Sequence, residues 1–585
     1  MKFLAGVALL APLAAAVWPI PSHYSHGDKT LWISDDVAIT YQQPLHFQQY
    51  SLRASASAAD AGSGSQRIVQ KAVSRAYETI FKQSYVPWRF NHRFSDFEPK
   101  TTNKKFIQSI ALVQNKTDAA GVLKPKEGQF DEGYTLVVGP AGKVTITSAS
   151  SLGLARGLTT FTQLFFAHSK GGAYTKLAPV RIDDSPKFAH RGLNMDVSRN
   201  FFPIDNILRT IDALAYNKMN RLHLHITDAQ SWPLEIPALP ELSAKGAYGP
   251  GMTYSPADVQ RIYTYGALLG VAVVMEIDQP GHTSSIWHSH PELIAAWNEQ
   301  PNWITYAAEP PSGTLKLNSP AVYKFLSTLY KDLLPRLSPL TSYFHTGGDE
   351  IKYAAYKLDD TVKSDDPAVL QPLLQKYIDT VHKHVRDAGL TPVVWEEIVL
   401  TYNLTVGKDV LIQAWQEPTS AVAITNMGHK ALVGDYNFWY LDCGHGQWLD
   451  FEPGVASMKY YPYQDYCAPL KSWRQVYSYD PLTSIAKDKQ HLIVGGEVHM
   501  WAEQTDALNF DGKAWPRAAA AAEVLWSGAK DPATGQNRSQ IEASPRLADM
   551  RERLVARGVA AEPVQMPYCQ QDGSQCLYLA SFDDA

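Results

Sequence analysis

The chain has 585 residues, of which 45% are hydrophobic and 19% charged, and this length predicts about two to four globular domains. Its formal net charge is −5 with a pI ≈ 6.4, so it lacks the basic surplus that a nucleic-acid backbone or an anionic membrane would need. We therefore expect neither nucleic acid nor membrane as a partner. The 15 Trp and 30 Tyr favour an uncharged ligand with apolar faces, such as a sugar.

The N-terminus has the pattern of a secretory signal peptide. Lys2 precedes an apolar run over residues 3–16 that ends in alanines, and this run is shorter than the roughly 20 residues that cross a bilayer. We predict that residues 1–17 are a signal peptide and that the mature protein is secreted to the extracellular space. Asn115, Asn403 and Asn537 begin sequons and are predicted glycosylation sites, although such triplets also occur often by chance.

The four cysteines agree with export, because disulfides persist in oxidising compartments. Three connectivities are open to four cysteines. We favour the two local pairs, Cys443 with Cys467 and Cys569 with Cys576.

Residues 18–184 are predicted to form a small α+β domain. A turn-rich stretch contains a short strand at 37–41, and residues 51–66, rich in Ala, Ser and Gly, are typical of a flexible linker. An apolar stripe of Ile68, Ala72, Ala76 and Ile80 predicts an amphipathic helix over 67–81. The other predicted elements are strands at 106–113, 133–138 and 143–147 and a helix at 151–166.

From residue 185 to 585 the pattern changes to strands alternating with helices. Eight strands with intervening helices predict an α/β fold, a (β/α)8 TIM barrel with its active site at the carboxyl ends of the strands, followed by a C-terminal tail. A doubly wound open sheet is the alternative, but no G-x-G-x-x-G signal favours it. The predicted strands are 192–196, 221–227, 271–277, 342–346, 392–396, 410–414, 430–434 and 492–498, and the helices include 204–216, 256–269, 321–334, 370–388 and 513–526.

Carboxylates and aromatic residues gather after these predicted strands. The fourth strand leads into HTGGDE, residues 345–350, where Gly347 and Gly348 precede Asp349 and Glu350. Neighbouring residues of a strand point to opposite faces, so the two carboxylates share one site only if the chain leaves strand geometry. Two glycines permit that departure.

Seven ordered motifs connect the chain to a known family. They are HRGLNMDVSRNFFP (190–203), NKMNRLHLHITDAQSWPLE (217–235), EIDQPGHT (276–283), HTGGDE (345–350), VVWEE (393–397), NFWYLDCG (437–444) and GGEVHMWAE (495–503). With these motifs the sequence resembles glycoside hydrolase family 20, the β-N-acetylhexosaminidases, and is most similar to the secreted fungal enzymes. The motifs lie between about residues 185 and 530, and the preceding α+β domain also matches the architecture of the family.

The resemblance implies an exo-acting hydrolase of chitin degradation that needs no cofactor and no metal. It would remove terminal non-reducing N-acetylglucosamine from chitooligosaccharides or glycoconjugates, and whether it also removes N-acetylgalactosamine stays open. Catalysis would be retaining and substrate-assisted, with the 2-acetamido oxygen of the substrate attacking C1 to form an oxazolinium intermediate. Asp349 would orient the acetamido N–H, Tyr440 would donate to its carbonyl oxygen, and Glu350 would be the general acid and then the base.

This division of labour sets an expectation for the pKa values and the pH optimum. Enclosure should raise the pKa of Glu350 while Asp349 stays ionised, and the optimum should be mildly acidic. The resemblance also implies the substrate-binding side chains. They are Arg191, Glu503 and Asp442 for the sugar hydroxyls, Trp395, Trp415 and Trp501 for the pocket wall, Trp473 or another aromatic ring near it for the subsite beyond the cleavage point, and the Asp228–His282 pair behind Glu350.

Two other functions remain as alternatives. His223 and His225 share one face of a strand and, with His282, resemble the metal site of a barrel amidohydrolase. A catalytically dead sugar-binding barrel is the second alternative, although the acid Glu350 is present. The resemblance further suggests a homodimer. The stretch up to about residue 105 is a candidate propeptide, which would be cleaved near Lys104-Lys105 and would stay bound to the mature protein.

Overall fold

The computed structural model describes residues 17–41, 43–45, 63–450, 463–571 and 576–577. The predicted signal peptide, apart from Val17, and most of the predicted linker lie outside the described residues. By its contacts the chain divides into two units, one drawn from 1–119, 131–186 and 529–585 and the other from 120–130 and 187–528. None of the helices in the described part of the chain combines the length and apolar character needed to span a bilayer.

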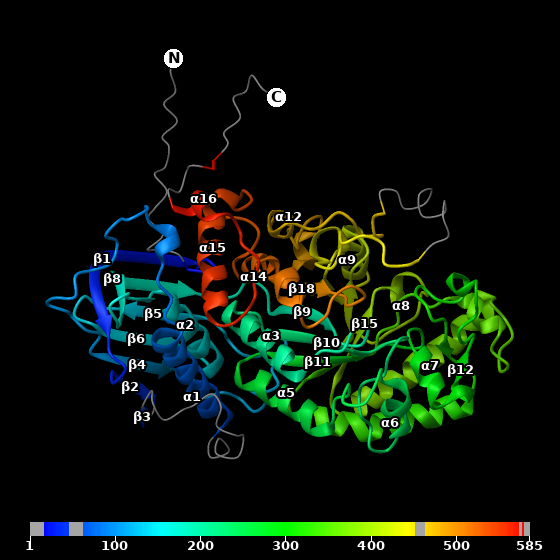
Figure 1. The fold of residues 1–585 in the computed structure, drawn as a ribbon. Helices are drawn as coiled ribbons and strands as arrows, with labels where there is room; N and C mark the ends of the chain where they lie inside the picture. The colour runs from blue at the N-terminus through cyan, green and yellow to red at the C-terminus, as the bar shows by residue number, and fades with distance from the viewer. Residues whose placement is uncertain (1–16, 42, 46–62, 451–462, 572–575, 578–585) are drawn as a thin grey trace. The chain divides into compact units, whose positions relative to one another are not determined.

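The first unit is built on a mixed sheet with strand order β1-β8-β5-β6-β4-β2-β3, in which β7 pairs with β8. Helices α1 and α2 pack against one another beside this sheet (Figure 1). Gly157 allows α2 to approach closely, because a Cβ there would lie 2.5 Å from Ile146 Cγ2 of β6. The bounds are β1 His23–Ile33, β2 Ala38–Tyr41, β3 Gln43–Leu45, α1 Gly64–Tyr77, β4 Ser109–Gln114, β5 Tyr134–Val138, β6 Lys143–Ser148, α2 Ser151–Gln163, β7 Phe166–Ala167 and β8 Ala173–Asp184.

The two longest strands of this sheet, β1 and β8, escaped the sequence prediction. Only the last three residues of β1 are fully buried, so it shows no apolar alternation. β8 contains Pro179, which reads against a strand. The predicted helix at 67–81 begins earlier, at Gly64, because Ser63 and Gln66 form a capping box.

The C-terminal segment differs from the predicted domain assignment, which attached it to the barrel. Helix α15, Gln540–Ala556, belongs to the first unit. Its buried Arg553 donates to the backbone carbonyls of Gln163 and Phe165 at the end of α2, and Asp549 accepts a hydrogen bond from Tyr85. A buried guanidinium needs such acceptors, and the first unit supplies them. The last short helix is α16, Pro567–Gln571.

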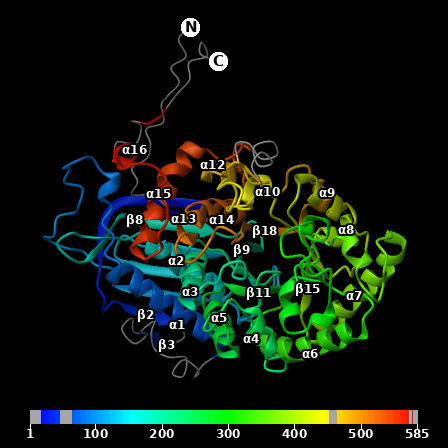
Figure 2. The ribbon, with the colours of Figure 1, turned by 45° about the vertical axis from the view of Figure 1, so that its right-hand side comes forward.

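The second unit is a closed barrel of eight parallel strands, as predicted, and each predicted strand overlaps one of them. Helices including α3, α5, α6 and α7 lie outside the strands (Figures 1 and 2). The strands are β9 His190–Asp196, β10 Arg221–Thr227, β11 Ala272–Ile277, β14 Tyr343–His345, β15 Thr391–Trp395, β16 Leu411–Ala414, β17 Lys430–Val433 and β18 Ile493–Met500; β12 Ile294–Ala295 and β13 Thr314–Leu315 form a separate small sheet. The helices are α3 Ile204–Tyr216, α4 Glu241–Gly246, α5 Pro256–Leu268, α6 Pro320–Leu337, α7 Pro367–Asp387, α8 Glu397–Leu400, α9 Pro418–Asn426, α10 Tyr436–Trp439, α12 Trp473–Ser478, α13 Phe510–Ala514 and α14 Arg517–Ser527.

The interior of the barrel changes character along its axis. One layer is apolar and consists of Val274, Tyr343, Val393, Leu411, Leu432 and Val494. The next positions toward the carboxyl ends of the strands are polar, among them His223, Glu276 and His345. Because a buried charge must be paired, these polar residues form a network that leads toward the site.

Candidate active site

The HTGGDE segment leaves β14 and turns both carboxylates into a pocket at the carboxyl ends of the barrel strands. Gly347 and Gly348 have φ of 65° and 103°, and Glu350 also has positive φ, 51°. A Cβ on Gly347 would lie 1.7 Å from Oδ1 of Asp278, which accepts the Gly348 N–H at 2.8 Å. The departure from strand geometry therefore takes place as the two glycines predicted. The pocket is lined by residues that include Arg199, Asp278, His282, Trp303, Glu309, Asp349, Glu350, Trp395, Trp415, Tyr440, Asp442, Trp448, Tyr466, Trp501 and Glu503.

Behind Glu350 lies the Asp228–His282 pair that the motifs implied. His282 Nε2 is 3.3 Å from Oε2 of Glu350, and His282 Nδ1 is 3.0 Å from Oδ1 of Asp228. Burial alone would lower the pKa of His282, but the negative charges of Asp228 and Asp278 outweigh it and hold that pKa well above its usual range. His282 is therefore a cation held between two carboxylates.

The pKa values of the two catalytic candidates are the reverse of our expectation in the open site. Burial raises the pKa of Glu350, but the hydrogen bond and charge of His282 outweigh burial and leave this pKa below its usual value. Burial and then the charge of Asp278 raise the pKa of Asp349 well above its usual range. The charge of Asp278 and a hydrogen bond to it favour a proton on Asp349, so we expect the pair to hold one proton between them.

One oxygen of Asp349 is prepared to accept a further hydrogen bond. Its Oδ1 is buried and has no hydrogen-bond partner among the residues described. Leaving a buried carboxylate oxygen unpaired costs about 1–3 kcal/mol. Asp349 lines the pocket, so its carboxyl is placed to meet a ligand N–H.

The predicted aromatic wall is assembled as one cluster. Trp415 stacks on Tyr440 with ring centroids 5.9 Å apart, and Trp501 lies 6.1 Å from Trp395 and 6.4 Å from Tyr440. Both predicted disulfide pairings are confirmed, and Cys443–Cys467 packs within this aromatic cluster, while Cys569–Cys576 lies in the C-terminal segment. The rings of this cluster line the pocket and offer it apolar faces, which suit a methyl group or a sugar face.

The prediction for Arg191 is wrong. This residue stands at the amino end of β9, where its guanidinium is buried, donates to the carbonyls of Phe188 and Lys218, and lies 5.0 Å from the ring of Trp526. Arg199, at the opposite end of the same strand, reaches the pocket instead. The rule that barrel sites lie at the carboxyl strand ends could have separated the two.

Arg199 is held by several carboxylates. Its Nη2 is 3.0 Å from Asp228 Oδ2 and 3.3 Å from Glu309 Oε2, and its Nη1 is 3.4 Å from Asp196 Oδ2. It also lies 5.1 Å from the centroid of Trp501. Glu309 belongs to a loop without a recognisable motif, so it could not be predicted from the sequence.

The other two residues predicted to bind hydroxyls do line the pocket. Burial and then Glu309 raise the pKa of Glu503 well above its usual range. Burial raises the pKa of Asp442 to about 7, and its buried Oδ1 has no hydrogen-bond partner within the described chain. Both side chains can therefore accept or donate hydrogen bonds at neutral pH.

The prediction for Trp473 is also wrong. It begins α12, is 9% exposed, and packs on Tyr477 and Arg474 rather than lining the pocket. Trp303 and Trp448 reach the pocket from loops instead, and Trp448 is 38% exposed. Loops of this kind carry no periodic signal, so only the folded chain reveals them.

The remaining predicted residues have simple positions. Asn115, Asn403 and Asn537 are all exposed, and their glycosylation stays a prediction. His223, His225 and His282 do not meet at one point, because His225 and His282 each contact Asp228 while His223 contacts Glu276. The amidohydrolase-like arrangement is therefore not formed.

Comparisons with known proteins agree with this architecture. The sequence profile described as "Glycosyl hydrolase family 20, catalytic domain" matches residues 188–529, and one described as "beta-acetyl hexosaminidase like" matches residues 17–164. The chain is 42% identical to a beta-hexosaminidase of Arthroderma benhamiae over 98% of each chain. It is 32% identical to the chitooligosaccharidolytic beta-N-acetylglucosaminidase of Ostrinia furnacalis, covering 82% of this chain and 79% of that one.

A solved structure extends the likeness to the fold. The chitobiase of Flavobacterium johnsoniae matches 94% of this chain and 74% of its own, with a TM-score of 0.68 and 25% identity. The match covers both the sheet-based unit and the barrel. Together with the ordered motifs and the carboxylate pair at the barrel mouth, these likenesses establish that the chain belongs to glycosyl hydrolase family 20.

Proposed function

We propose that the protein is an exo-acting β-N-acetylhexosaminidase that removes terminal non-reducing N-acetylglucosamine from chitooligosaccharides or glycoconjugates with retained configuration. The observation that carries the proposal is the buried carboxyl of Asp349 beside Glu350, in a pocket walled by tryptophans. Relatives named beta-hexosaminidase and chitooligosaccharidolytic beta-N-acetylglucosaminidase support it. Removal of N-acetylgalactosamine is the finer alternative.

The substrate's acetamido oxygen is the nucleophile in this proposal. An intramolecular nucleophile held in line gains an effective molarity of roughly 10⁵–10⁸ M. Asp349 accepts the acetamido N–H through Oδ1 and balances the positive charge that develops there, and Tyr440 donates to the acetamido oxygen. Asp349 carries this negative charge only after it loses the proton that burial and the charge of Asp278 favour.

Glu350 protonates the leaving oxygen and then activates water. In the open site its side chain is 34% exposed and bonded to the His282 cation, so it begins ionised. A bound sugar covers Glu350 and removes water, which raises its pKa toward the value an acid needs. We therefore expect the rate to fall as pH rises above neutral, with a mildly acidic optimum.

Hydrolysis of aryl N-acetyl-β-glucosaminides tests the proposal. Wild type should be active, Asp349→Asn and Glu350→Gln should lose about 10²–10⁴-fold in kcat, and an otherwise identical substrate without the acetamido group should react very slowly. Asp205→Asn makes the same chemical change at an exposed position of α3 and should keep full activity. An inert wild type, or full activity in both site variants, would refute the assignment.

Three features of the natural protein are part of the same proposal. Export rests on the apolar leader and on the two disulfides. Retention of a cleaved propeptide is supported by β1, the edge strand of the first unit's sheet, because its backbone hydrogen bonds to β8 would hold the segment after cleavage. A homodimer rests on the family alone. Size measurement and N-terminal sequencing of the secreted protein test all three.

A further inference from the structure

Imidazole and carboxylate groups alternate along the inside of the barrel, starting from the catalytic candidate Glu350. Beyond His282 and Asp228, His225 Nε2 lies 2.6 Å from Asp228 Oδ2, and His225 Nδ1 lies 2.5 Å from Oε2 of Glu276. The line continues through His223, Glu497, His190 and Glu127 with separations of 3.0, 2.9, 2.6 and 3.3 Å. The mechanism above uses only its first three members.

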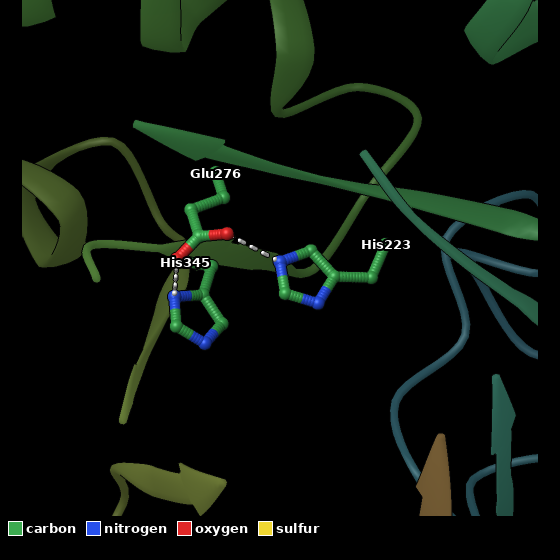
Figure 3. Close-up of side chains that lie close together, drawn as sticks. All are labelled: His223, Glu276 and His345. Carbon is green, nitrogen blue, oxygen red and sulfur yellow. Dashed lines mark hydrogen bonds and ion pairs between the residues drawn. The ribbon is translucent and has the colours of Figure 1, made fainter. Parts of the chain in front are cut away.

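Glu276 on β11 is the point where this line branches. Its Oε2 faces His225 and His223, both on β10, and its Oε1 accepts the indole N–H of Trp395 at 2.7 Å. His345 Nδ1 on β14 is 3.1 Å from the same Oε1. Figure 3 shows Glu276 between His223 and His345, with its two oxygens directed to different rings. One carboxylate thus touches side chains from β10, β14 and β15.

The pairing of opposite charges stabilises this network. Burial alone would lower the pKa of His223 and His225, but their carboxylate neighbours outweigh it and raise these pKa values to about 9 and about 10. The three imidazoles nearest the site are therefore cations between carboxylates. Glu276 is fully buried, and a buried charge is stable only while each partner stays in place.

The donor types around Glu276 would also suit a metal ion, but the protonation of His223 argues against one. Both of its nitrogens face carboxylate oxygens, at 2.9 and 3.0 Å. An imidazole that carries both protons has no lone pair for a metal. The cluster is better explained as a set of hydrogen bonds than as a coordination sphere.

We propose that Glu276 is a positioning residue for the reaction, a single buried carboxylate that fixes both halves of the catalytic site. Through His225, Asp228 and His282 it aligns the acid Glu350. Through the indole N–H it fixes Trp395 in the wall that holds the acetamido group. The proposal rests on the proposed function, since it has Glu276 position the acid Glu350 and the wall that holds the acetamido nucleophile of that reaction.

The two arms predict different kinetic signatures. Loss of alignment at Glu350 matters most when the leaving group is poor, because a good leaving group departs with little protonation. Loss of alignment at Trp395 weakens the hold on the acetamido group for every leaving group. A residue that serves stability alone would lower the amount of folded enzyme without changing the dependence on the leaving group.

The experiment compares Glu276→Gln with wild type on phenyl and 2,4-dinitrophenyl N-acetyl-β-glucosaminides. We expect kcat/KM to fall roughly tenfold more for the phenyl substrate, a part of the 10²–10⁴-fold that a general acid supplies. Glu523→Gln is the matched control: Glu523 is a fully buried carboxylate bonded to Tyr477, outside the line. It should lower the unfolding temperature and leave the ratio of the two substrates unchanged.

A second variant keeps the test decisive if Glu276→Gln does not fold. His225→Gln breaks the link between Glu276 and Asp228 and should give the same loss that depends on the leaving group. Trp395→Phe removes the donor to Glu276 and shortens the ring in the pocket wall, without touching the arm that leads to Glu350, and should raise KM for both substrates alike. If Glu276→Gln or His225→Gln keeps the wild-type ratio of kcat/KM between the phenyl and 2,4-dinitrophenyl substrates, the proposal is overturned. An inert wild type would instead overturn the proposed function itself.

Discussion

Replacement of Gly347 by alanine should damage both stability and catalysis. The new Cβ would lie 1.7 Å from Asp278 Oδ1 and 2.5 Å from Asp278 Cα, so rotation of the Asp278 side chain alone cannot make room. A non-glycine residue in left-handed backbone costs about 1–2 kcal/mol, and overpacking costs about 1–3 kcal/mol. The free energy of unfolding should therefore fall by about 2–5 kcal/mol.

To relieve this clash Asp278, the neighbour of Asp349, must move. A shift of about 1 Å in a positioning contact can cost about 10²-fold in rate, so kcat/KM of the folded variant should fall by about that factor. Urea unfolding measures the first effect, and hydrolysis of an aryl N-acetyl-β-glucosaminide, corrected for the folded fraction, measures the second.

Gly389 provides the matched control for this prediction. It also has positive φ, 77°, but its added Cβ meets no atom within 4 Å. Gly389→Ala should therefore lose only the backbone contribution, about 1–2 kcal/mol, and keep wild-type kcat/KM. Equal unfolding free energies for the two variants, or full activity in Gly347→Ala, would show that the close approach of Gly347 to Asp278 does not position the carboxylates.

Three further predictions follow from the charges. Arg199→Met should lower kcat/KM about 10²-fold, because Arg199 reaches the pocket, whereas Arg191→Met should reduce thermal stability and leave the activity of the folded enzyme intact; the opposite ranking would restore Arg191 to the site. Asp278→Asn removes a neighbouring negative charge that raises the pKa of Asp349, so the acidic limb of the kcat profile should move to lower pH, and an unmoved limb would contradict the shared proton. The folded pKa of His223, about 9, exceeds its unfolded value of about 6.5. Its contribution to the free energy of unfolding is therefore complete below pH of about 6.5 and is lost as pH rises toward about 9. Urea unfolding across this pH window should show the decrease, and the decrease should be smaller in His223→Gln.

Much of the barrel could be predicted because local pattern and tertiary role coincide there. Strands such as β10 and β18 are buried along their whole length and read as apolar or mixed runs between turn signals. The HTGGDE segment was also readable, because two glycines before two carboxylates indicate a backbone that must leave strand geometry. The edge strand β1 was not readable, because most of its side chains are partly exposed and its order comes from pairing with β8.

The wrong predictions for the site concern residues that are close to the motifs in the sequence but lie away from the pocket in the structure. Arg191 and Arg199 lie in the same motif, yet they stand at opposite ends of β9, so only one can reach the barrel mouth. Trp473 lies between two of the motifs, but at the start of α12 it packs on Tyr477 and Arg474. Trp448 comes from a loop with no pattern of its own.

The sequence by itself determined the family, the order of the barrel strands and the identity of the carboxylate pair, because each depends on residue types at fixed local spacing. The tertiary structure alone decided which arginine lines the pocket and how the pKa values of Glu350 and Asp349 are shifted. It also decided that Glu276 contacts both arms of the site. Those properties depend on burial and on charges brought together from distant strands, and a pKa is set by such neighbours in space.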